Sequence, residues 1–276
     1  GDKIDFIAMP DFAAGAMENL GCIIYRETDL LCDEATATQG EKERVAHVVA
    51  HELAHMWFGD YTTMKWWNGL WLNESFATYM ENKVVDMWKP EWHTWDTFAG
   101  SRASAFGLDQ LNSTHAIEVA VENPFQIDEI FDLISYEKGC SVLRMLEQFI
   151  GPEAFRAGVR ICCKRQHLAN TVADDLWNAL DEGAAASGLK ISVRNLMDKI
   201  ARGTTVGNRA RLVGKLSPSG NGLMAALGIG GAMTNPYCKF YDPNRGTLVT
   251  MVGQMFLVDL LEKLDGKATI VQSNTD

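Results

Sequence analysis

The chain has 276 residues, of which 47% are hydrophobic and 22% charged, and its formal net charge is −11. This composition predicts a globular protein with a sizeable core and argues against a disordered chain. The negative charge argues against nucleic-acid binding, because phosphate recognition requires a basic surface. No apolar run approaches the ~20 residues that span a bilayer, so we expect no membrane partner.

The six cysteines are scattered along the chain and form no CxxC pair. Their even number leaves disulfides open, but this dilute spacing is typical of reduced thiols. Residues 1–5 do not have the layout of a signal peptide. We therefore expect a cytoplasmic protein, and the abrupt, strand-like start indicates part of a longer chain.

The predicted elements change from strands to helices along the chain. Residues 3–9 and 20–26 are short, β-branched and apolar, which is typical of strands. Beyond Gly40 the apolar residues recur at helical spacing, and a short extended link is expected at residues 62–67. Helices are predicted at residues 41–58, 70–87, 92–106, 135–150, 152–166 and 172–185. Thr171 is the expected N-cap of the last helix. The pattern predicts an α+β fold, mainly α, with a small N-terminal β portion.

The composition shifts near residue 202, and eleven of the 24 glycines lie beyond it. We therefore divide the chain into an α-rich unit of residues 1–200 and an unassigned glycine-rich tail of residues 201–276. One more helix is predicted at residues 248–264. Three origins of the tail stay open at this point: a divergent end of the protein, a fused segment, or the product of an altered reading frame.

A metal-binding pattern lies in the first predicted helix, where residues 51–55 spell HExxH. His51 and His55 are four positions apart, so both imidazoles face the same side of the helix and can reach one ion. A catalytic zinc site needs three protein ligands and an open position for water. Glu52 projects beside the metal, where it can take a proton from that water. The expected third ligand is Glu74 on the next predicted helix, and the set predicts one Zn²⁺ ion.

The other histidines do not fit this ligand spacing. His47 lies one turn before His51 on the same face, but it is too far back along the helix to share the ion. A fourth protein ligand would also close the site to water. His93, His115 and His167 are expected to be packing or surface residues. The alternative for the whole cluster is a helix whose histidines only cap or pack.

Two further motifs accompany the metal pattern, because residues 15–19 spell GAMEN and residues 135–139 spell SYEKG. Together with HExxH and Glu74, they resemble the M1 family of zinc aminopeptidases, most closely its bacterial aminopeptidase N-like type. In that family they are the exopeptidase motif, the segment of the catalytic tyrosine, and the zinc signature. The resemblance implies a thermolysin-like zincin catalytic domain in residues 1–200.

The resemblance also implies how the substrate is bound. Glu18 would bind the free α-ammonium group, since a buried cation must be paired. Asn19 belongs to the same substrate-binding motif. The backbone of Gly15, Ala16 and Met17 would line the site against the peptide, because small residues permit close approach.

For catalysis, the resemblance implies that Tyr136 donates its hydroxyl to the developing oxyanion. Glu52 would act as the general base and return its proton to the leaving amine. The implied function is a zinc-dependent aminopeptidase that hydrolyses the N-terminal residue from peptides with a free N-terminus, by metal-activated water.

The sequence departs from the family pattern at several points. Leu20 and Gly69 stand where the family often has Trp and Asp. The resemblance fades near residues 197–199, and the β-sheet domain and helical domain that flank this region in family members are not recognised. The main alternative is therefore a non-catalytic zinc-binding remnant, followed by a zinc hydrolase of another specificity. The sequence indicates no oligomeric state.

Overall fold

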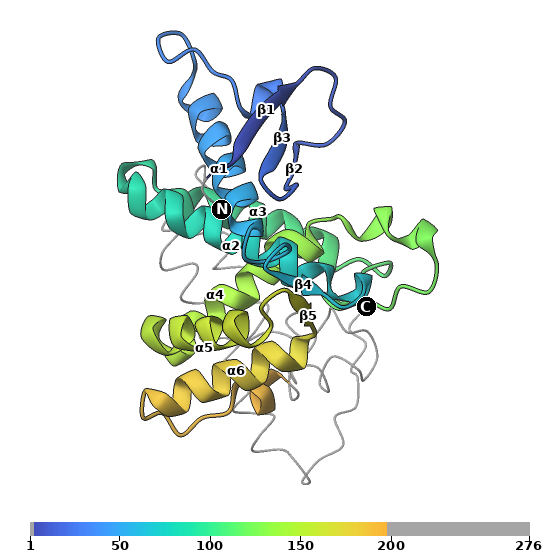
Figure 1. Ribbon diagram of the computed structural model, residues 1–276, viewed down its shortest axis with the longest axis vertical. Coiled ribbons are helices and arrows are strands. Elements are labelled where there is room, and N and C mark those ends of the chain that lie inside the picture. Colours follow the sequence, from blue (N-terminus) through green and yellow to red (C-terminus); the bar gives the residue numbers. More distant parts are fainter. Residues whose placement is uncertain (1–2, 198–276) are drawn as a thin grey trace, which may run out of the picture.

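The structure is a computed structural model that describes residues 3–197. Most of these residues are helical, and a small sheet lies at the N-terminal end (Figure 1). The predicted class, α+β and mainly α, is confirmed. The helix predicted at residues 248–264 and the rest of the tail lie outside the described residues. None of the helices in the described part is both long and apolar enough to cross a membrane.

The N-terminal sheet has three strands in the order β1-β3-β2. They are β1 (Asp5–Met9), β2 (Ala16–Met17) and β3 (Cys22–Arg26). β1 runs parallel to β3, whereas β2 pairs antiparallel with β3 through Ala16 and Tyr25. The two predicted strands correspond to β1 and β3. The sequence pattern did not predict β2, which lies within the GAMEN motif.

The predicted helices are confirmed, with ends that differ by a few residues. The bounds are α1 (Gln39–His55), α2 (Leu70–Trp88), α3 (Thr94–Asp109), α4 (Gly139–Ile150), α5 (Pro152–Arg165) and α6 (Ala173–Ala186). Short turns are η1 (Glu27–Asp29), η2 (Trp67–Gly69), η3 (Pro90–Trp92), η4 (Pro124–Gln126) and η5 (Asp128–Ile130). The helix predicted at residues 135–150 is divided, because it begins as a π-helical turn, η6 (Ile134–Lys138), before continuing as α4.

A second, smaller sheet links distant parts of the chain. β4 (Thr62–Met64), inside the predicted extended link, pairs in parallel with β5 (Ala169–Thr171). The prediction that Thr171 caps α6 is wrong. Thr171 is the last residue of β5, and the N-cap is Val172, whose N–H donates to the Asp175 carboxylate over 3.0 Å.

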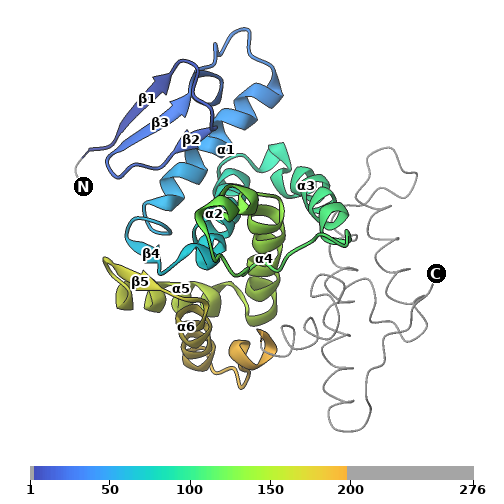
Figure 2. The same cartoon turned by 90° about the vertical axis from the view of Figure 1, so that its right-hand side faces the viewer.

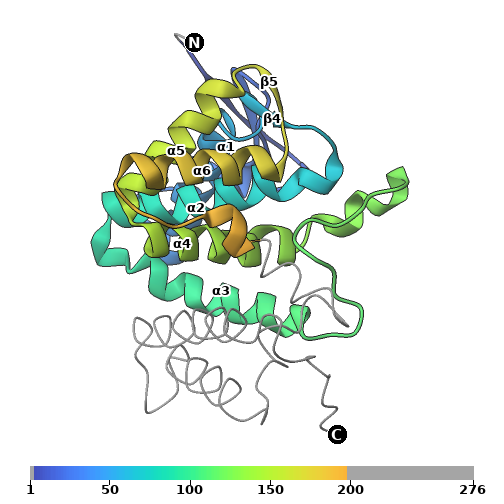
Figure 3. The ribbon, with the colours of Figure 1, turned by 90° about the horizontal axis from the view of Figure 1, so that it is seen from below.

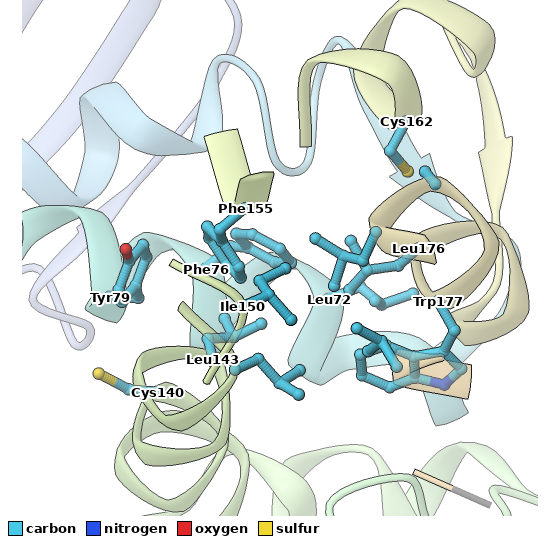
Figure 4. Packing of buried hydrophobic residues seen from close by; sticks show 14 of the residues in the cluster. Leu72, Phe76, Tyr79, Cys140, Leu143, Ile150, Phe155, Cys162, Leu176 and Trp177 are labelled. Atoms are coloured by element: carbon cyan, nitrogen blue, oxygen red, sulfur yellow. The ribbon is translucent and has the colours of Figure 1, made fainter. Parts of the chain in front are cut away.

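The helices pack in layers around α2 (Figures 1 and 2). α1 and the N-terminal sheet lie on one side of α2, and α4, α5 and α6 follow on the other. α3 packs against α2 and η6 (Figure 3). The main core joins buried apolar side chains of α2, α4, α5 and α6 (Figure 4), including Phe76, Leu143, Phe155 and Leu176. This core fixes α2, the helix that carries the expected third metal ligand.

The sheet is attached to α1 by a separate small core. Ile23 and Tyr25 of β3 are fully buried and pack with Val48 of α1. Because β2 pairs with β3, this packing also brings the GAMEN motif to the end of α1. The fold therefore brings together the three motifs recognised in the sequence.

Candidate metal and active site

The helix α1 is fixed at its start by a capping box. The Thr38 hydroxyl accepts from the Glu41 N–H over 3.3 Å, and the Glu41 carboxylate accepts from the Thr38 N–H over 2.7 Å. These bonds satisfy backbone donors that the helix itself leaves free. The last turn of α1 carries His51, Glu52 and His55, which the helical repeat places side by side.

The expected metal ligands converge at the contact between α1 and α2. Oε2 of Glu74 lies 3.2 Å from Nε2 of His51 and 3.3 Å from Nε2 of His55. The ligand atoms of these residues all lie within 4.8 Å of one another. Burial alone would raise the pKa of Glu74, but hydrogen bonding and charge from His51 and His55 hold it well below its ordinary value. The carboxylate is therefore ionised, as a metal ligand must be.

The far side of each imidazole is also occupied. Nδ1 of His55 donates to the Phe58 carbonyl over 2.9 Å, and Nδ1 of His51 donates to Oε2 of Glu81 over 2.6 Å. With Nδ1 as the donor on the far side, Nε2 is the atom of each ring that faces Glu74; it donates to this carboxylate here and would bind a metal after losing its proton. Two oriented imidazoles and one buried carboxylate form a donor set that fits Zn²⁺.

Glu81 is a site residue that the sequence analysis missed. It lies two turns after Glu74 on α2, and its second oxygen is 3.4 Å from Nδ1 of His47. The contact agrees with the prediction that His47 is not a ligand, since His47 is outside the convergent set. The signal was present in the sequence, because positions seven apart lie on the same face of a helix.

The carboxylate of Glu52 is buried next to the ligand set. The residue is only 6% exposed, and among the described residues its Oε2 has no hydrogen-bond partner. Burial raises the pKa of Glu52 to about 7, against the opposing charges of His51 and His55. A carboxyl group with a pKa in this range can both accept and return a proton near neutral pH.

Tyr136 reaches the same centre from η6. Its ring stacks on that of His51, with centroids 5.9 Å apart and an angle of 10° between the planes. Burial raises the pKa of Tyr136, and the carboxylates of Glu74, Glu18 and Glu52 raise it further. The hydroxyl therefore keeps its proton and can donate a hydrogen bond in the centre of the site.

The GAMEN motif approaches from the sheet. Oε1 of Glu18 lies 3.9 Å from Nδ1 of His55, and Glu18, Glu52 and His55 form a second group whose ligand atoms lie within 4.8 Å. A Cβ at Gly15 would come within 3.1 Å of both Asp29 and Arg44, which pair across η1 and α1. A side chain at this position would require the Asp29–Arg44 pair to shift by a few tenths of an ångström, so glycine gives the closest approach.

The other motif residues lie around Glu18. Ala16 and Met17 form β2, and the Met17 side chain is half-exposed. The Asn19 amide donates to the Met17 carbonyl over 3.5 Å, within its own loop. The structure thus places Asn19 in the turn that presents Glu18.

Two of the remaining histidines make specific contacts. His167 stacks on Tyr61 at 4.4 Å, which agrees with a packing role. Nε2 of His115 lies 2.8 Å from Oδ2 of Asp132, just before η6. The sequence analysis did not anticipate this pair.

The family model described as Peptidase family M1 domain matches residues 2–200. The chain belongs to peptidase family M1. M1 peptidases are metallopeptidases, and the His51, His55 and Glu74 cluster is a possible metal site of the expected kind. The resemblance drawn from the sequence motifs is confirmed at the level of the family. The narrower likeness to the bacterial type stays a prediction.

Several relatives of this M1 chain are named aminopeptidases. A probable aminopeptidase 2 of Sulfurisphaera tokodaii is 51% identical over 183 residues, which cover 66% of this chain and 23% of that protein. Aminopeptidase M1 of Arabidopsis thaliana is 50% identical over 182 residues, 66% of this chain and 21% of that protein. A leucyl aminopeptidase of Saccharolobus solfataricus is 49% identical over 181 residues, 65% of this chain and 23% of that protein. The chain thus spans less than a quarter of the length of these relatives.

Proposed function

We propose that the chain is the catalytic part of a zinc-dependent aminopeptidase that removes the N-terminal residue from peptides. The observation that carries the proposal is the convergence of His51, His55 and Glu74 beside the buried carboxylate of Glu52, whose Oε2 has no hydrogen-bond partner within residues 3–197. The printed names of the relatives support an aminopeptidase activity.

The proposal includes the fold and the extent of the catalytic domain. We assign residues 1–200 to a thermolysin-like zincin domain, and the family match over residues 2–200 supports this boundary. The glycine-rich tail of residues 201–276 is left without a function. A cytoplasmic location stays a prediction, supported by the free thiols of the cysteines within residues 3–197.

His51, His55 and Glu74 would hold a single Zn²⁺ ion. When bound, zinc would polarise the scissile carbonyl and lower the pKa of a water toward ~7. The Nδ1 partners of the two histidines, Glu81 and the Phe58 carbonyl, would hold the imidazoles in the ligand orientation.

Glu52 moves the protons in this scheme. Its carboxylate takes a proton from the attacking water and then delivers it to the nitrogen of the scissile bond. The C–N bond therefore breaks with a neutral amine, and not an amide anion, as the leaving group. The absence of a hydrogen-bond partner on Oε2 among the described residues leaves this atom free to receive the proton. No covalent bond to the protein is formed.

Tyr136 and Glu18 act on the two ends of the reacting residue. The protonated Tyr136 hydroxyl donates to the oxygen of the scissile carbonyl as negative charge develops on it. Glu18, at the end of the site nearest the sheet, pairs with the α-ammonium group of the substrate. A blocked N-terminus would lose this ion pair, which explains a restriction to N-terminal residues.

The test measures bound zinc and the hydrolysis of a panel of aminoacyl p-nitroanilides by the full 276-residue chain. Chelation should abolish hydrolysis, and added zinc should restore it. Glu52→Gln should retain zinc but lower kcat by ~10²–10⁴, because the general base is lost. Glu43→Gln makes the same change nearer the start of α1 and should leave kcat unchanged.

Two results would contradict the proposal. If zinc binds stoichiometrically and no aminoacyl amide is cleaved, the chain is a non-catalytic zinc-binding remnant. If N-acetylated substrates are cleaved as fast as free ones, the chain is a zinc hydrolase of another specificity.

A further inference from the structure

A buried hydrogen bond joins α2 to the η6 turn at the residues next to the metal ligand and the tyrosine. The Ser75 hydroxyl donates to the Ser135 carbonyl over 2.6 Å. Ser75 follows Glu74 in α2, and Ser135 precedes Tyr136 in η6. Ser75 is fully buried and Ser135 is 1% exposed, so the bond is shielded from water. A shift of either backbone segment would therefore change the distance between Glu74 and Tyr136.

Gly139 makes this close approach possible. It is the first residue of α4, and a Cβ built there would lie 1.7 Å from Oγ and 2.7 Å from Cβ of Ser75. Such contacts do not occur between real atoms, so a larger residue would push η6 and α4 away from α2. Glycine inside a helix costs about 1 kcal/mol relative to alanine. A glycine at this point is explained by the packing of Ser75 against the helix.

The turn is also fixed at its start. Oδ1 of Asp132 accepts from the N–H groups of Ile134 and Ser135, over 2.9 and 3.1 Å. The Asp132 carbonyl accepts from the Tyr136 N–H over 3.1 Å. These bonds set the internal shape of η6, whereas the Ser75 bond sets its place relative to α2. A π-helical turn is often found at functional sites, where it re-aims a side chain.

We propose that Ser75 is a positioning residue for the reaction, because its hydrogen bond to Ser135, seated on Gly139, sets the place of the Tyr136 hydroxyl relative to the metal ligands. The inference rests on the proposed aminopeptidase function. Tyr136 stacks nearly parallel on His51, so a displaced turn would slide the hydroxyl away from the reacting carbonyl. A misplacement of about 1 Å can lower a rate by roughly 10²-fold.

A double-mutant cycle tests whether Ser75 acts through Tyr136. Ser75→Ala should lower kcat by ~10- to 100-fold, with little change in KM or in zinc affinity. In a Tyr136→Phe background the same substitution should change kcat by less than ~2-fold, since the hydroxyl that it positions is gone. Equal effects of Ser75→Ala in both backgrounds would overturn the proposal.

Thr78→Val is the matched control. Thr78 is buried one turn later on α2, and its hydroxyl has no hydrogen-bond partner among the described residues. The variant removes a hydroxyl from the same helix and should leave kcat unchanged. A loss of kcat as large as that of Ser75→Ala would show that any change in this helix has the same effect, which also overturns the proposal.

A second readout does not depend on activity or on bound metal. The six tyrosines can be replaced by 3-fluorotyrosine, and Tyr136→Phe assigns the fluorine resonance of Tyr136. Ser75→Ala should shift or broaden that resonance alone, and Thr78→Val should not. An unmoved resonance in an active enzyme would overturn the positioning role. If the resonance responds but the parent chain cleaves no substrate, the link between Ser75 and Tyr136 stands and the proposed function fails.

Ser75→Cys covers the case in which Ser75→Ala does not fold. It keeps a weak donor, but its sulfur is larger than the hydroxyl oxygen and would lengthen the contacts with Ser135 and Gly139, so the Tyr136 resonance should be displaced and kcat lowered. Wild-type kcat together with a displaced Tyr136 resonance in Ser75→Cys would overturn the proposal.

Discussion

The two walls of the site differ in how firmly they are held. On the helical wall, the side chains of His51, His55 and Glu74 are at most 12% exposed. On the sheet wall, the Glu18 side chain is 20% exposed, and its neighbours Met17 and Leu20 are 41% and 72% exposed. The helical wall is anchored in the main core through α2, and α1 shares a separate small core with β3, whereas Glu18 follows a strand of only two residues.

This difference separates metal binding from substrate recognition. The packing of α1 against α2 holds the three metal-binding side chains in place before the metal binds. Little conformational entropy is then lost on binding. The Glu18 carboxylate of the sheet wall lies 3.9 Å from Nδ1 of His55, but the hydrogen bonds that orient the two imidazoles come from the Phe58 carbonyl and Glu81. Changes on the helical wall should therefore affect zinc, and changes on the sheet wall should affect the substrate.

The largest expected effect comes from Glu74→Ala. The substitution leaves two imidazoles without their carboxylate partner, so the variant should lose stoichiometric zinc on dialysis and all hydrolysis above background. Glu18→Ala, the same change on the sheet wall, is the control and should keep one zinc per chain. Metal analysis of both proteins checks the comparison, which fails if Glu74→Ala retains zinc.

Glu81→Gln should weaken zinc binding by about 10- to 100-fold, because the amide no longer supports the imidazole of His51 as a charged acceptor does. Competition with a chromogenic chelator measures the affinity. Glu43→Gln on α1 provides a control that should bind zinc like the parent. Equal affinities in the two variants would show that Glu81 does not support the ligand.

On the sheet wall, Glu18→Ala should raise KM for aminoacyl substrates by about 10-fold, the lower range for a hydrogen bond to a charged group at a partly exposed site. Zinc affinity should not change. N-acetylated peptides should resist the parent enzyme, since they cannot form this ion pair. Unchanged cleavage of aminoacyl substrates by Glu18→Ala would contradict the assigned role.

The smallest effect concerns the pair of His115 and Asp132 that fixes the start of η6. The hydrogen bond to Asp132 raises the pKa of His115, and the Ala116 carbonyl adds to it, against burial and the charge of Lys138. A raised pKa stabilises the fold fully below the unfolded value of about 6.5, and this stability is lost as pH rises through the folded value.

Parent and His115→Asn should therefore differ by ~1–2 °C in Tm at pH 5.5 and by less at pH 9. Melting curves at both pH values measure the difference. Because the two side chains are 21% and 22% exposed, added salt should reduce the difference. A difference that grows with pH would contradict this assignment.

The parts of the site that are local in sequence could be predicted. His51 and His55 follow from the helical repeat, and Glu74 follows from a pair of neighbouring helices. What could not be predicted depends on long-range pairing or on hydrogen-bond register. β2 exists because Ala16 and Met17 meet β3, and β5 exists because its residues meet β4, far back in the chain.

Register errors have the same physical origin. The sequence of η6 has ordinary helical spacing, so it does not reveal the wider π-helical turn. In the structure, the Asp132 side chain accepts from the first N–H groups of this turn. Thr171 has a side chain typical of an N-cap, but its backbone belongs to β5, where it pairs with Met64 of β4. In both cases local propensity is overridden by contacts that the sequence does not display.

The pairing of β4 with β5 has a consequence for the order of folding. It closes a loop of more than a hundred residues, and the entropy lost in closing so long a loop is recovered only when the intervening helices have already packed. β4 lies in the connection between α1 and α2, the two helices that carry the metal ligands. We therefore expect the connection between the metal-binding helices to be completed late, after the helices that follow it in the chain have packed.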